Sequence, residues 1–183
     1  MERTMRMTTV KTSTLNLVLG ALFMALAIIM PFITGQIPEV GSMLLTMHLP
    51  VLICGFVCGW KYGLAVGFVV PLLRSVMFGM PPLMPTGFCM AFELAAYGAC
   101  TGLLYGKLPK NTVSVYVSLI GAMILGRIVW GLVSIVIYGV MGNAFSVQVF
   151  MAGAFLNAVP GIILQIAVIP VIIMALKRAK VME

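Results

Sequence analysis

The chain has 183 residues, of which 62% are hydrophobic and only 8% are charged, and its formal net charge at pH 7 is +7. Soluble domains carry about 25% charged residues, so this composition excludes a soluble globular protein and indicates a polytopic membrane protein. A span needs ~20 apolar residues, which leaves room for about six spans with short loops in one transmembrane domain, residues 1–183. The basic residues are spread over short loops and both termini, so the charge does not indicate a nucleic-acid partner.

The predicted elements are all membrane helices joined by loops, which makes the fold class an all-α six-helix bundle. The apolar runs give six spans, at residues 15–33, 48–59, 61–78, 85–105, 112–138 and 149–176. The first loop, 34–47, is long for a helical bundle and is predicted to act as a lid. His48 opens the second span close to Pro50, so we place it at the membrane boundary as a helix-end partner.

The basic residues predict which side of the membrane each loop faces. Nine of the eleven Lys and Arg residues lie in the N-terminal lead, the second and fourth connections and the C-terminal tail. Six spans place all of these segments on one side, and basic loops are retained in the cytoplasm. Both termini are therefore predicted to be cytoplasmic. The remaining two basic residues, Arg74 and Arg127, lie within spans.

Polar side chains inside the spans are predicted to form a pocket that opens to the outside. An ionisable group in hydrocarbon costs at least ~2.5–3.5 kcal/mol and usually faces a bundle interior or a wet cavity. Glu93 lies about 12 Å below the outer start of its span, at 1.5 Å per residue. The direction of each span and loop places six residues in the outer half, namely Arg74, Glu93, Tyr97, Arg127, Asn157 and Gln36.

Two buried arginines share one buried acid, which leaves one guanidinium for an anionic substrate. An arginine can bind a carboxylate through two parallel hydrogen bonds. We expect Arg74, which is nearer the outer mouth, to bind the anion, while the sequence leaves open which of the two arginines pairs with Glu93. The alternative is an Arg74–Glu93 ion pair that only fixes helix packing.

No catalytic or metal-binding pattern is present in the sequence. It contains one histidine and has no HExxH, no GxSxG and no Walker lysine. The four cysteines lie in apolar runs and are expected to be small buried hydrophobic residues. We therefore expect no enzyme activity and no metal or cofactor in this chain. Because it has no ATP-binding domain, any use of ATP depends on partner subunits.

Four stretches carry a resemblance to a known family. They are LGALFMA at 19–25, HLPVLICGF at 48–56, GLAVG at 63–67 and PLLRS at 71–75. With them the chain resembles, over nearly its whole length, the substrate-binding (S) components of energy-coupling factor (ECF) vitamin transporters. Within that family it is most similar to the pantothenate-type branch.

The resemblance implies a partner complex and a site. It implies six helices in a prokaryotic plasma membrane, with a vitamin pocket in the outer half that the first loop gates. Ala21 and Ala25 lie one turn apart and match the family's small-xxx-small pattern, at which two helices approach closely. The resemblance implies that this strip faces a transmembrane coupling subunit, which joins two ATPases. A pantothenate substrate, being an anion, agrees with the spare arginine.

Other readings of the sequence stay open at this point. Within the same family the vitamin could be pyridoxine, riboflavin or folate. A structural membrane scaffold is a second class, although a scaffold has no need for polar groups that converge at one depth. A self-sufficient channel, transporter or enzyme is a third, although a free-standing transporter needs a cytoplasmic route and the cytoplasmic halves of the spans carry no charged residue.

The predicted topology can be tested with cysteine labels. Labels placed in the loops 34–47, 79–84 and 139–148 should react with an impermeant reagent added from outside. Labels at Lys107 or Lys180 should not react, because basic segments are retained in the cytoplasm. Labelling of position 107 from the outside would rule out the six-span arrangement.

Overall fold

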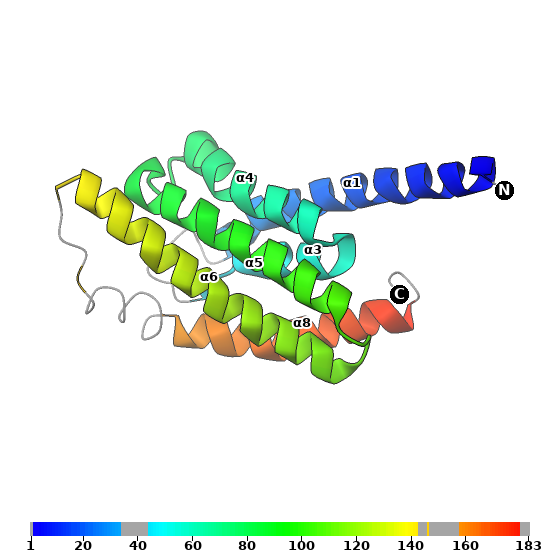
Figure 1. Cartoon of the computed structure of the whole chain (residues 1–183). Helices are drawn as coiled ribbons and strands as arrows, with labels where there is room; N and C mark the ends of the chain where they lie inside the picture. The colour runs from blue at the N-terminus through cyan, green and yellow to red at the C-terminus, as the bar shows by residue number, and fades with distance from the viewer. Residues whose placement is uncertain (1, 34–43, 143–145, 147–157, 180–183) are drawn as a thin grey trace.

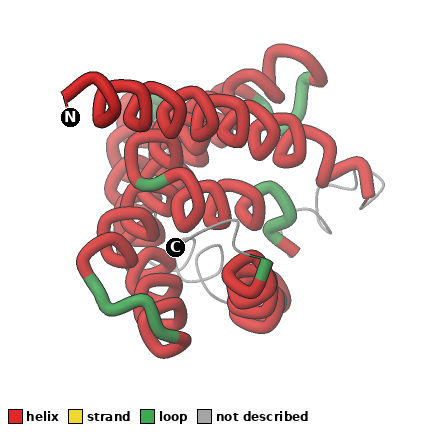
Figure 2. The backbone as a smooth tube through the Cα atoms, turned by 90° about the vertical axis from the view of Figure 1, so that its right-hand side faces the viewer, coloured by secondary structure: helices red, strands yellow, loops and turns green. Residues whose placement is uncertain are grey.

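The structure is a computed structural model that describes residues 2–33, 44–142, 146 and 158–179. All regular elements in these ranges are helices, as Figure 1 and Figure 2 show from two directions. They are α1 (Glu2–Ile33), α3 (His48–Cys58), α4 (Trp60–Phe78), α5 (Phe88–Lys107), α6 (Thr112–Val140) and α8 (Val159–Arg178). A π-helical turn, η1 (Leu83–Gly87), leads directly into α5. The all-helical fold class predicted from the sequence is confirmed.

Five of the described helices are long and apolar enough to cross a membrane. The helix α3 has only 11 residues, which is shorter than the ~20 residues of a full span. The second predicted span therefore corresponds to a short helix, and the count of six membrane crossings stays a prediction. The middle predicted spans agree with α3, α4, α5 and α6 to within a few residues.

The first and last predicted spans differ from the observed helices. The first span was predicted at 15–33, which agrees with Ser13–Phe32, the part of α1 that is apolar enough to cross a membrane, although α1 as a helix begins earlier, at Glu2. The last was predicted to begin at 149, and α8 begins at Val159. Residues 147–157 lie outside the described part of the chain.

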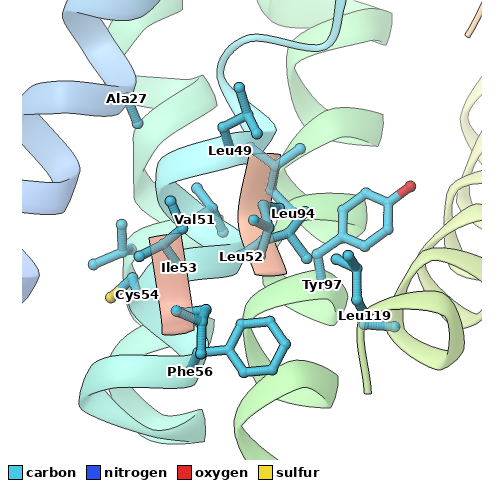
Figure 3. Close-up of a cluster of buried hydrophobic side chains, with 14 of the residues drawn as sticks. Ala27, Leu49, Val51, Leu52, Ile53, Cys54, Phe56, Leu94, Tyr97 and Leu119 are labelled. Atoms are coloured by element: carbon cyan, nitrogen blue, oxygen red, sulfur yellow. The ribbon is translucent and has the colours of Figure 1, made fainter. Parts of the chain in front are cut away.

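The short helix α3 lies at the centre of the bundle. It is apolar on all sides, which is typical of a fully buried helix, and ten of its eleven residues are buried. Its side chains meet Ala27 of α1, Leu94 of α5 and Leu119 of α6 in one hydrophobic core (Figure 3). The neighbouring helices therefore take their positions around α3.

Helices α3, α4 and α5 approach one another through glycines, which we call the glycine seam (Gly55, Gly63, Gly67 and Gly98). A Cβ atom on Gly63 or on Gly55 would overlap the carbonyl oxygen of Gly98, and one on Gly67 would overlap the carbonyl of Leu94. Gly63 and Gly67 are one turn apart, the spacing at which small residues let two membrane helices pack closely. The seam thus brings backbones into direct contact.

The connections that carry basic residues lie at one end of the bundle (Figure 1). Lys177 Nζ donates to the carbonyl of Lys110 at 2.8 Å, which joins the end of α8 to the α5–α6 connection. Burial and the neighbouring Lys177 ammonium lower the pKa of Lys110. The Tyr62 hydroxyl donates to the carbonyl of Ser13 at 3.2 Å, so the start of α4 lies beside α1. This arrangement agrees with the one-sided basic pattern, while the side of the membrane stays a prediction.

The glycine seam yields a stability prediction within one helix. Gly98→Ala should destabilise the protein by roughly 1–3 kcal/mol, because the added methyl group meets the backbone of Gly63. Gly106→Ala is the matched control, since nothing lies within 4 Å of a Cβ there. It should be neutral or stabilising by up to ~1 kcal/mol, because alanine favours the helix. Thermal unfolding of the purified variants in detergent measures the difference. Equal melting temperatures for Gly98→Ala and Gly106→Ala would contradict the close backbone contact at Gly98.

Candidate functional site

Glu93 of α5 and Arg127 of α6 form a buried ion pair. Arg127 Nη1 lies 2.8 Å from Glu93 Oε1, and the two residues are 6% and 2% exposed. The approach of α5 to α6 depends on Gly126, since a Cβ there would lie only 2.8 Å from Cδ1 of the Tyr97 ring. Removing one partner of a buried pair costs ~3–5 kcal/mol, because it leaves an uncompensated charge. Each residue therefore requires the other.

Two further side chains complete the Glu93 cluster, which consists of His48, Glu93, Tyr97 and Arg127. His48 Nε2 lies 3.7 Å from Glu93 Oε1, and the His48 ring packs edge-on against the Tyr97 ring with centroids 5.4 Å apart. Tyr97 follows Glu93 by one turn of α5 and is only 1% exposed. Its hydroxyl points away from the apolar side chains of the core (Figure 3). Three helices thus supply one polar cluster.

Several nitrogen atoms of the Glu93 cluster have no hydrogen-bond partner within the described part of the chain. They are Nε and Nη2 of Arg127 and both ring nitrogens of His48. The 3.7 Å between His48 and Glu93 exceeds the usual 2.7–3.2 Å of an N–H···O hydrogen bond. A buried polar group left without a partner costs ~1–3 kcal/mol. Nε and Nη2 of Arg127 are donors that an accepting or anionic group would satisfy, whereas Oε1 of Glu93 is an acceptor that also has no hydrogen-bond partner.

Arg74 is buried at a different place, against α1. Its Nη1 donates to the carbonyl of Ile28 at 2.8 Å, and its guanidinium carbon lies 5.3 Å and 5.7 Å from the ring centroids of Phe32 and Phe78. It therefore ties α4 to α1 at the end opposite to the basic connections. The sequence left open which arginine pairs with Glu93; in the structure it is Arg127, and the Arg74–Glu93 pair considered as the alternative is not formed. A role for Arg74 in substrate binding stays a prediction.

His48 opens the second helix, as predicted, but its surroundings differ from the expectation. It was placed at the membrane boundary, but it is only 2% exposed and lies against Glu93. The turn before α3 explains the difference, because Leu45, Thr46 and Met47 are all buried as well. The chain has already entered the bundle when α3 begins. The signal was the shortness of the second apolar run, since a helix too short to span can begin inside the membrane.

The remaining predicted site residues fall in two groups. Gln36 and Asn157 lie outside the described residues, so their place in the pocket stays a prediction. Ala21 and Ala25 are both exposed on α1, whereas Ala27 is completely buried. Among the described residues, no three His, Cys, Asp or Glu side chains are grouped so that they could hold a metal ion.

Comparisons with known proteins identify the family. The family model named "ECF transporter, substrate-specific component" matches residues 15–173, which includes all four residues of the Glu93 cluster. No curated protein and no solved structure matches the chain. Proteins of this family are multi-pass membrane subunits that bind a small-molecule substrate and act with partner ECF subunits, including ATPases. The match covers most of the chain, which therefore belongs to the family of substrate-specific components of ECF transporters.

Proposed function

We propose that this subunit captures a vitamin from outside the cell for ATP-driven uptake, and that the vitamin is pantothenate. The observation that carries the proposal is the Glu93 cluster, a set of polar side chains buried inside an apolar bundle of this family. Pantothenate is an anion, and the described helices bury two arginines, Arg74 and Arg127, against the single acid Glu93. Pyridoxine, riboflavin or another vitamin is the alternative substrate.

The exposed alanines of α1 support a coupling role. Ala21 and Ala25 lie one turn apart and face away from the bundle, so a second membrane helix can approach the α1 backbone closely there. We propose that this strip contacts the transmembrane coupling subunit, which in turn joins two ATPases. No ATP is bound by this chain in the proposed mechanism.

Titration calorimetry of the purified protein tests the substrate. Pantothenate should bind, while pantetheine, which lacks the carboxylate, should bind more weakly because the buried guanidinium loses its anionic partner. Tight binding of pyridoxine or riboflavin, without binding of pantothenate, would assign the chain to another branch of the family. Failure of all four compounds to bind would contradict the vitamin-capturing function itself.

The coupling surface is tested by separating binding from uptake. Ala21→Trp or Ala25→Trp should abolish uptake in cells that also contain the partner subunits, because the indole blocks close helix approach. Binding of substrate by the isolated variants should be unchanged. Val171→Trp is a suitable control, since Val171 is 60% exposed on a different helix, α8. If uptake survives both alanine changes, the strip is not the coupling surface.

A further inference from the structure

The guanidinium of Arg127 has one edge that no described residue contacts by a hydrogen bond. Its Nη1 lies 2.8 Å from Glu93 Oε1, while Nε and Nη2 are buried and have no hydrogen-bond partner among the described residues. In a guanidinium these two nitrogens share one side, and their N–H groups point in the same direction. That pair of donors matches the two oxygens of a carboxylate.

The second buried arginine is already engaged. Arg74 donates to the carbonyl of Ile28 and lies between the rings of Phe32 and Phe78. Its partners come from α1 and from its own helix, and none of them is an acid. These contacts explain its burial as a connection between α1 and α4. The unused pair of donors therefore distinguishes Arg127 from Arg74.

We infer that Arg127 binds a substrate carboxylate through Nε and Nη2 while Nη1 stays on Glu93, and that His48 takes up a proton when it does. The inference rests on the proposed function and adds the residue that recognises the anionic group. It differs from the expectation drawn from the sequence, in which Arg74 bound the anion.

The proton follows from the charges that surround the cluster. The ionisable side chains facing Glu93 are His48 from α3, Cys89 and Tyr97 from α5, and Arg127 from α6. With His48 neutral, Glu93 and Arg127 cancel, and a substrate carboxylate would leave one net negative charge in a buried site. Histidine changes its charge between about pH 5 and 8. A proton on His48 would restore neutrality at a distance of 3.7 Å from Glu93.

The carboxylate contact is tested with a pair of ligands and a set of variants. Pantothenate and pantothenol differ only in that an alcohol replaces the carboxylate. Arg127→Gln should weaken pantothenate binding at least ~30-fold and pantothenol binding much less, because a charged contact contributes roughly 2–5 kcal/mol on truncation. Arg127→Lys should recover part of the loss, since it keeps the charge without the paired donors. Lys107→Gln, which removes an exposed charge at the far end of α5, is the matched control.

Some outcomes would overturn this contact. They are an unchanged preference for pantothenate in Arg127→Gln, or loss of that preference in Arg74→Gln instead. If Arg127→Gln does not fold, the double variant Glu93→Gln/Arg127→Gln removes both charges together and should still lose the preference. Binding of riboflavin but not pantothenate by the wild type would reject the carboxylate contact and leave the transporter function standing. Binding of no vitamin would reject the proposed function.

Proton uptake is measured by calorimetry in two buffers that differ in their ionisation enthalpy. Wild-type protein should take up as much as about one proton per pantothenate bound, and binding should be tighter at about pH 6 than at about pH 8, because the bound state holds more protons. His48→Gln should abolish both effects. Glu93→Gln should abolish the uptake while pantothenate still binds. Binding of pantothenate without proton uptake in the wild type would refute the role of His48.

Discussion

The ion pair between Glu93 and Arg127 fixes how two of the membrane helices lie against each other. Two charges removed from water are tolerated only while they meet with good geometry. A slide of α6 by one helical turn, ~5.4 Å, would separate Nη1 from Oε1 and leave both charges alone among apolar side chains. The register of α5 and α6 is thus set by one contact of 2.8 Å. The Glu93 carboxylate is thereby held in a fixed position relative to His48 and Tyr97.

The residues of the Glu93 cluster lie on helices that are tightly packed in the bundle. His48 begins the buried helix α3, and Glu93 and Tyr97 lie on α5, which the glycine seam joins to α3 and α4 through backbone contacts. A functional group is held most accurately when it sits on a packed helix and not on a loop. The polar cluster therefore depends on the packing of the apolar core, because the backbone contacts between the helices determine where the charged side chains can meet.

The sequence left open which arginine pairs with Glu93, but it was sufficient for the fold class and for the positions of the four middle helices. These follow from hydropathy and from depth, which depends only on the distance of a residue from the end of its span. The surroundings of Arg74 did not follow, because depth says nothing about which way a side chain turns around the helix axis. The surroundings of His48 did not follow either, because hydropathy locates the start of α3 but does not show that its first residue lies against Glu93.

The glycine seam also has a consequence for how such a protein can diverge. Contacts between backbones do not depend on side-chain size, so α3, α4 and α5 can keep their packing while residues on their other faces change. The spans at α6 and α8 are only 33% and 28% buried, compared with 61% for the span that contains α5. Substitutions on those two helices meet fewer neighbours. A lineage can therefore change many residues on α6 and α8, apart from the Arg127 that pairs with Glu93, while the three-helix scaffold is inherited unchanged.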